Sequence, residues 1–325
     1  MHPTLLVIIL GALAAALCFA LRLRAARLSV RAALTTLPLS AVLGAVLGKC
    51  VYVLCLISRL YPRYGMGAFT RLQLTEFSFV GVMAGVMLGA WIAARLHKIK
   101  VRPLMDAFAP AYALFAACIK GSEYFLGTHG VGAYLENESL YFFPLAVKNE
   151  WDEYFLAVFM LYAILALLVL IVSFAFGKKV SRVPGLLMNM TVYHLAIGLM
   201  LCENLRVQTI KWGFVKAEQL FGAIICLIVL VRVCYATFHR KGEDGPAAIA
   251  LIGKGMKRCP FISRWWPIAA LFACAGLLIV VEFALDGKIA IPTLWAYVLM
   301  GATLVSVSGL FVYAARRLLK TSSIT

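Results

Sequence analysis

Several ionisable side chains lie inside stretches of the chain that are otherwise apolar, which makes them the first candidates for chemistry. They are Lys49, Asp106, Lys120, Glu123, His194, Glu203 and Arg206. A charge in an apolar layer costs several kcal/mol unless it is paired or hydrated, so each predicts a partner or a polar cavity. Lys120 and Glu123 are spaced i to i+3, as are Glu203 and Arg206, so each pair shares a helical face and can neutralise itself. His194 is expected to be a packed, hydrogen-bonded histidine.

Two interpretations of these charges remain open. In the first, they form structural ion pairs that fix the register of packed helices. In the second, which we favour, Lys49, Lys120 and Arg206 line an outward-opening polar cavity for an anionic head group. Three cations on separate apolar stretches exceed what one buried pair would need. Asp106 lies near the inner boundary, where it could cap a helix that begins at Ala107.

The composition indicates which elements must position these residues. Hydrophobic residues make up 63% of the 325-residue chain and charged residues 14%, and the mean hydropathy is +0.94. A soluble domain of this size could not bury so much apolar side chain. Hydrocarbon requires a spanning segment of roughly 20 apolar residues to be helical. Such segments occur at residues 3–21, 37–58, 77–96, 105–128, 154–177, 184–205, 215–238, 266–285 and 292–315, which predicts an all-α, polytopic integral membrane protein with about nine transmembrane helices.

The charge of the chain follows these segments. Its 31 Lys and Arg residues outnumber 14 Asp and Glu residues. Most of the basic residues fall in alternate connections, at 22–31, 95–102, 178–182, 232–264 and 316–320. This bias predicts a multi-pass protein with its N-terminus outside and its C-terminus in the cytoplasm. It also favours acidic lipid head groups over nucleic acid as partners.

The chain is expected to have three parts. Residues 1–238 would form a seven-helix membrane core, 239–264 a basic cytoplasmic linker, and 265–325 a C-terminal transmembrane hairpin with a basic tail. Stripes of small residues predict close helix packing in the core; one contains Gly81, Gly85 and Gly89. The scattered cysteines have no metal-ligand spacing, so we expect neither a metal nor another cofactor.

The residue order at 78–123 is similar to a known pattern. It contains Ser78-Phe79-Val80-Gly81 with Gly85, then Ala94-Arg95, then Asp106-Ala107-Phe108-Ala109-Pro110, then Lys120-Gly121-Ser122-Glu123. This order resembles the bacterial prolipoprotein diacylglyceryl transferase family, whose pattern is S-F-H-G-G-x-x-G, an inner loop with Arg, D-x-x-A-P, and the Arg of G-R-x-G-N-F. Elsewhere, Gly48-Lys49-x-x-Tyr52 resembles G-x-R-x-x-Y/V, Glu203-Asn204-Leu205-Arg206 resembles V-E-F-F-R, and Gln219-Leu220 resembles the following G-Q-I/L. The similarity covers roughly residues 38–236.

The resemblance implies a reaction and a set of site residues. The family transfers the diacylglyceryl group of phosphatidylglycerol to the cysteine thiol of a lipobox-containing preprolipoprotein, at the outer face of the bacterial inner membrane. The implied partners are therefore phosphatidylglycerol, or another anionic phospholipid, and preprolipoproteins. The implied catalytic residues are Lys120, Glu123 and Glu203; the implied substrate-binding residues are Lys49, Tyr52, Ser78, Gly81, Asp106, Arg206 and Gln219.

The chain departs from the family pattern at several motif positions. The motif histidine is Val80, the motif arginine is Lys120 and the motif asparagine is Glu123. Lysine keeps the charge of arginine but lacks its planar, bidentate fork. Leu199 replaces a second family arginine, and the H-P-S-Q block corresponds to Asn149-Glu150-Trp151-Asp152.

These departures leave three hypotheses. The first is a divergent diacylglyceryl transferase, with Lys120, Lys49 and Arg206 around the phosphate and Glu123 or Glu203 as the proton acceptor. The second is a catalytically degenerate paralogue that binds an anionic lipid or a partner membrane protein. The third is a small transporter with a proton or anion relay, which ranks last because the sequence has neither an inverted repeat nor a pair of broken helices.

Overall fold

The structure is a computed structural model that describes residues 2–127, 129–207, 209–212, 215–238, 276 and 293–321. Within these ranges, eight helices are long and apolar enough to cross a membrane. The predicted all-α, polytopic fold is therefore confirmed. The expected segment at 266–285 lies outside the described residues, apart from Gly276.

The chain divides into two compact units, Met1–Ala223 and Ile224–Thr325. The first contains α1 (Pro3–Ala25), α2 (Arg31–Cys55), α5 (Phe79–Leu96), α6 (Val101–Ser122), α7 (Val158–Val180), α8 (Leu186–Leu205) and the start of α9 (Ala217–Phe238). The second contains the remainder of α9 and α12 (Thr293–Thr321). Within this second unit, Thr237 Oγ1 donates a hydrogen bond to the Ala314 carbonyl at 3.2 Å. The division of the chain at residues 238 and 264 stays a prediction.

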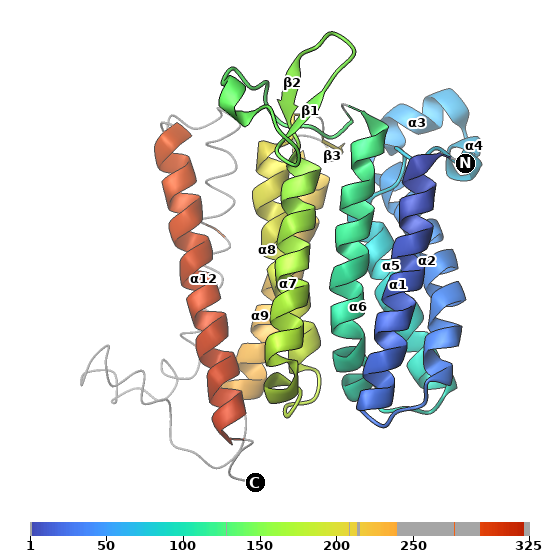
Figure 1. The fold of residues 1–325 in the computed structure, drawn as a ribbon, viewed down its shortest axis with the longest axis vertical. Coiled ribbons are helices and arrows are strands. Elements are labelled where there is room, and N and C mark those ends of the chain that lie inside the picture. Colours follow the sequence, from blue (N-terminus) through green and yellow to red (C-terminus); the bar gives the residue numbers. More distant parts are fainter. Residues whose placement is uncertain are drawn as a thin grey trace. The chain divides into compact units, whose positions relative to one another are not determined.

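The short elements of the first unit gather at one end of its helices, which we call the hairpin end (Figure 1). There β1 (Ala146–Lys148) pairs antiparallel with β2 (Tyr154–Leu156), and Val147 of β1 joins Val131, Ala157 and Phe159 in a small core. The helices α3 (Ile57–Tyr64) and α4 (Gly67–Thr70) lie at the same end. The turns that join α1 to α2 and α5 to α6 lie at the opposite end.

Two predicted helix boundaries are wrong at the hairpin end. Residues 154–156 form strand β2, so α7 begins at Val158 rather than at 154. At the other boundary, α6 ends at Ser122 and a 3-10 turn, η1 (Glu123–Leu126), replaces its last predicted residues. Hydropathy alone cannot separate these segments from helix, because a short apolar strand has the same composition as the first turn of an apolar helix.

Helices α2 and α5 pack closely along the predicted stripe of glycines. A Cβ atom at Gly81 would meet the Leu47 carbonyl oxygen at 2.6 Å, and one at Gly89 would meet the Ser40 backbone nitrogen at 2.7 Å. Between them, a Cβ at Gly85 would collide with the Leu43 carbonyl. The stripe therefore allows backbone-to-backbone contact between the two helices, as small residues do in membranes.

Asp106 caps a helix, but not the one that the sequence suggested. Helix α6 begins at Val101, so Asp106 lies in its second turn and not before it. Its carboxylate instead accepts hydrogen bonds from the backbone N–H groups of Gly185 at 2.6 Å and Met188 at 3.0 Å, at the start of α8. The carboxylate satisfies N–H groups that have no partner within α8. Asp106 therefore joins α6 to α8 far from the hairpin end.

We expect Gly85→Ala to destabilise the protein by about 1–3 kcal/mol, because the added methyl group must push α2 and α5 apart. Unfolding of the purified protein in mixed micelles by increasing denaturing detergent would measure the change. Gly121→Ala is the matched control, because its Cβ would find only Ala163 Cβ at 4.0 Å. Equal stability of the two variants would contradict the close contact.

We expect Asp106→Ala to cost about 1–3 kcal/mol, since it leaves buried N–H groups at the start of α8 without an acceptor. Asp106→Asn keeps one acceptor oxygen and is expected to lose less stability than Asp106→Ala. The same unfolding measurement compares them. If alanine were tolerated as well as asparagine, the cap would have no role in stability.

Candidate functional site

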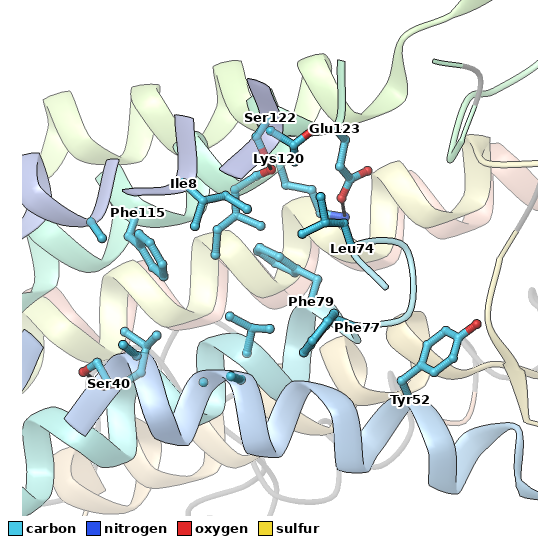
Figure 2. Close-up of a pocket in the computed structure, with 18 of the residues that line it drawn as sticks. Ile8, Ser40, Tyr52, Leu74, Phe77, Phe79, Phe115, Lys120, Ser122 and Glu123 are labelled. Atoms are coloured by element: carbon cyan, nitrogen blue, oxygen red, sulfur yellow. Dashed lines mark hydrogen bonds and ion pairs between the residues drawn. The ribbon is translucent and has the colours of Figure 1, made fainter. Parts of the chain in front are cut away.

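A cavity of about 750 Å³ lies within the first unit. Helix α1 packs against α6, and α2 packs against α5. One wall of the cavity is apolar and comes from α1 and α2, with Leu5, Ile8, Ala12, Leu37, Ala41 and Ala45. In Figure 2, Ser40 and Tyr52 mark the α2 side of the cavity, and Lys120 and Glu123 lie across from them. The cavity is therefore apolar along its length and polar where α6 ends.

The polar end contains a cluster of ion pairs. Lys120 Nζ lies 2.8 Å from Glu123 Oε1, and Arg206 Nη1 lies 2.7 Å from Glu203 Oε1. Both pairings predicted from the i to i+3 spacing are thus confirmed. Glu123 Oε2 also lies 3.6 Å from Arg206 Nη2. Glu123 therefore joins the two predicted pairs, one from α6 and one from α8, into one charged cluster.

Arg206 is held just beyond the C-terminus of α8. Its Nε donates a hydrogen bond to the Gly130 carbonyl at 3.2 Å. Burial acts to lower the pKa of Arg206, but the charges of Glu123 and Glu203 outweigh it and raise the pKa above its ordinary value. The guanidinium therefore stays charged. Nearby, Lys216 Nζ donates a hydrogen bond to the backbone carbonyl of Glu203 at 3.0 Å.

Lys120 is buried with its ammonium against an aromatic ring. The side chain is 4% exposed. Its Nζ lies 4.7 Å from the centre of the Phe79 ring, at the start of α5. The face of an aromatic ring attracts a cation, and the attraction is stronger away from water. Phe79 and Glu123 together fix where this charge faces the cavity.

Glu218 is a buried carboxylate in the cavity wall that the sequence pattern did not indicate. It lies in the first turn of α9 and is 4% exposed. Its Oε1 accepts hydrogen bonds from the Phe79 N–H at 2.6 Å and from Ser78 Oγ at 3.1 Å. Its Oε2 is buried and has no hydrogen-bond partner among the described residues. The available signal was an acidic residue at the start of an apolar segment, where the family pattern G-Q-I/L has glycine.

Lys49 has a partner of its own and does not join the cluster. Its Nζ lies 2.7 Å from Oε2 of Glu76, a second acidic residue that the sequence pattern did not indicate. Lys49 also lies 5.6 Å from the ring of Tyr52, which does line the cavity, but Lys49 itself is not a lining residue. Of the three cations expected in one cavity, the structure brings together Lys120 and Arg206 only.

The remaining residues predicted to bind substrate do not line the cavity and instead make structural contacts. Ser78 caps α5 by accepting a hydrogen bond from the Gly81 N–H at 3.3 Å. Gln219 Nε2 donates to Asn204 Oδ1 at 3.1 Å. Asp106 lies fourteen residues before Lys120 on α6, a separation of roughly 21 Å along a helix. His194, as expected, is hydrogen-bonded, with Nδ1 2.7 Å from the Met190 carbonyl oxygen.

His129 also lines the cavity, in the connection that follows η1. Desolvation lowers the pKa of its imidazole below the ordinary value, against the opposing charge of Glu123. The residue as a whole is exposed, although its ring is partly desolvated. A neutral imidazole at pH 7 can accept a proton. Among the described residues, no group of three or more His, Cys, Asp or Glu side chains is arranged to hold a metal ion.

Fold and site together define a polytopic membrane protein with a cavity that is apolar along its length and charged at one end. Residues 5–235 match the family model of prolipoprotein diacylglyceryl transferase. The chain therefore belongs to the prolipoprotein diacylglyceryl transferase family. No curated protein sequence matches the chain.

We expect Lys120→Ala to destabilise the protein by about 3–5 kcal/mol, because Glu123 loses its nearest buried cation. The double variant Lys120→Ala/Glu123→Ala is expected to lose less unfolding free energy than the sum of the losses of the two single variants, because the two side chains are coupled. Lys148→Ala is the control, because that lysine forms an exposed pair with Asp152. Detergent-induced unfolding would measure Lys120→Ala, Glu123→Ala, the double variant and the control. Silent single and double variants would contradict the cluster as a stabilising unit.

Proposed function

We propose that this protein is a diacylglyceryl transferase that takes its donor group from a membrane phospholipid. The observation that supports this best is the polarity of the cavity, with Lys120 and Arg206 at one end of an apolar wall. Pockets of about 300–1,000 Å³ hold small molecules and cofactors. The lipid phosphate and glycerol would occupy the charged end, and the acyl chains would extend past α1 and α2 into the bilayer.

In the proposed reaction, an acceptor thiolate attacks the glycerol carbon that bears the phosphate. The new S–C bond forms as the C–O bond breaks, and the electron pair of the C–O bond passes to the phosphate oxygen. Lys120 and Arg206 stabilise the charge that develops on that oxygen. The family resemblance implies phosphatidylglycerol as donor and a lipobox cysteine as acceptor.

The proton of the thiol needs an acceptor, and His129 fits that role best. The sequence favours Glu123 or Glu203 as this acceptor, but both carboxylates already face buried cations at 2.7–2.8 Å. The His129 imidazole lines the same cavity, and its lowered pKa favours the neutral form. A neutral base of this kind contributes about 10²–10⁴-fold to a proton-transfer step.

The proposed orientation places the hairpin end outside the bacterial inner membrane. The basic connections lie at the opposite end of the first unit, where the positive-inside rule favours the cytoplasm. Lipid and acceptor protein would then meet on the outer face. Residues 1–238 would act as the transferase core, with 265–325 as a membrane hairpin.

A second candidate function is lipid binding without catalysis. It is favoured by one observation: Lys120 and Arg206 are each already paired with a glutamate of the site. Such pairs offer less net charge to a leaving phosphate than free cations would. A transfer assay separates the two functions.

The assay uses the purified full-length protein in vesicles of mixed phospholipids and a lipobox peptide, with mass spectrometry of the thioether product. We expect product from the wild type and a transfer rate about 10²–10³-fold lower for Arg206→Ala. The transfer rate of His129→Gln is expected to be lower by about 10²-fold or more. Wild-type activity should fall as the pH drops through the lowered pKa of His129, since imidazolium cannot accept the proton, and His129→Gln should lack this acidic limb.

Glu136→Gln, in an exposed loop, is the control and is expected to keep full activity. No product from the wild type with any phospholipid would reject the transferase and leave the lipid-binding alternative. If His129→Gln formed product with the same pH profile as the wild type, the role of His129 would be rejected and the transferase would stand.

A further inference from the structure

We propose that the head group this site accepts best is zwitterionic, a phosphate joined to a primary ammonium as in phosphatidylethanolamine, with Glu218 binding the ammonium. The inference rests on the proposed phospholipid site and names its substrate class. It replaces the anionic donor that the family resemblance implied. Its basis is the set of charged side chains at the polar end of the cavity and one carboxylate oxygen, Glu218 Oε2, that has no hydrogen-bond partner among the described residues.

The buried charges of the cavity lining do not favour a net anion. Two cations, Lys120 and Arg206, face three carboxylates, Glu123, Glu203 and Glu218. Two of the carboxylates pair with the two cations at 2.7–2.8 Å. The third, Glu218, has no ion pair among the described residues and lies in a poorly solvated place, where a negative charge is costly until a cation binds beside it. A ligand that brings one negative and one positive group matches this arrangement better than a phosphate alone.

The other described cations near the cavity do not pair with Glu218 either. Arg59 and Lys211 also line it, but both side chains are exposed, so water and salt screen their charges. Lys216 donates to backbone carbonyls of Glu203 and Asn204 and is not a lining residue. Lys49 is neutralised by Glu76. Glu218 is therefore the buried carboxylate of the described lining without a cation of its own.

The geometry of Glu218 suits an ammonium donor. Ser78 and Phe79 hold Oε1, and this fixes the carboxylate while Oε2 stays without a hydrogen bond among the described residues. Phe79 also supports Lys120, whose ammonium lies 4.7 Å from its ring. Figure 2 shows Phe79 beside Lys120 in the cavity. The cation that would bind the phosphate and the anion that would bind the ammonium are thus positioned by the same residue.

The assignment changes the product of the proposed reaction and leaves its balance intact. The S–C bond forms, the C–O bond to phosphate breaks, and its electron pair goes to the phosphate oxygen. The thiol proton passes to His129 and then to the bulk solvent. The leaving group is phosphoethanolamine instead of glycerol phosphate. No further reactant is required.

Binding to the purified full-length protein in detergent tests the proposal, with native mass spectrometry as the measurement. Dioleoyl phosphatidylethanolamine and dioleoyl phosphatidylglycerol are titrated separately. We expect the wild type to bind the first at least about tenfold more tightly, the worth of one charge-assisted hydrogen bond. Glu218→Gln keeps an acceptor for Ser78 and Phe79 and is expected to lose this preference. Glu136→Gln, in the exposed loop, is the matched control and should keep it.

Each outcome decides the proposal. Equal or tighter binding of phosphatidylglycerol by the wild type would overturn it without reference to any variant. A preference that survives in Glu218→Gln would also overturn it, because the ammonium would then bind elsewhere. Soluble glycerophosphoethanolamine should not displace the bound lipid; displacement at equal concentration would show a site for a free head group instead.

The same two lipids, offered as donors with the lipobox peptide, separate this proposal from the proposed function. Product from phosphatidylglycerol alone would reject the head-group assignment and keep the transferase. A binding preference for phosphatidylethanolamine without product from either lipid would reject the transferase and keep the assignment. Failure of the wild type to bind either lipid would reject both.

Discussion

A charge inside an apolar layer must be neutralised by the protein, and Glu123 meets this requirement for two cations at once. Its carboxylate lies 2.8 Å from Lys120 and 3.6 Å from Arg206, so it connects the end of α6 to the residue that follows α8. Glu203 completes the pairing of Arg206 at 2.7 Å. Losing any one member would leave the cluster with an uncompensated buried net charge, so the cluster ties the position of these helices to the chemistry of the cavity.

The rest of the first unit follows from this arrangement. The backbone of α2 packs on the glycines of α5. At the start of α5, Ser78 and Phe79 donate hydrogen bonds to Glu218, in the first turn of α9. The Phe79 ring also lies 4.7 Å from Lys120 Nζ. The packing of these helices therefore positions both the apolar wall and the charged end of the cavity. The chain belongs to the prolipoprotein diacylglyceryl transferase family.

Sequence reasoning succeeded where one local rule decided the outcome. Length and hydropathy identify the spanning helices, and the i to i+3 spacing identifies the pairs of Lys120 and Arg206. It failed where a partner comes from a distant segment. Glu76 could not be assigned to Lys49, or Asp106 to the start of α8, because contacts across 27 and 79 or more residues depend on tertiary packing. For the same reason, the three-cation cavity predicted from the sequence became a site of two cations and three carboxylates.

An experimental structure of the full-length protein in phospholipid nanodiscs tests the central claim most directly. The account predicts phosphate density within hydrogen-bonding distance of both Lys120 Nζ and Arg206, with acyl-chain density along α1 and α2. Lipid density confined to the outer surface of the helices, with side chains or water filling the polar end of the cavity, would contradict it.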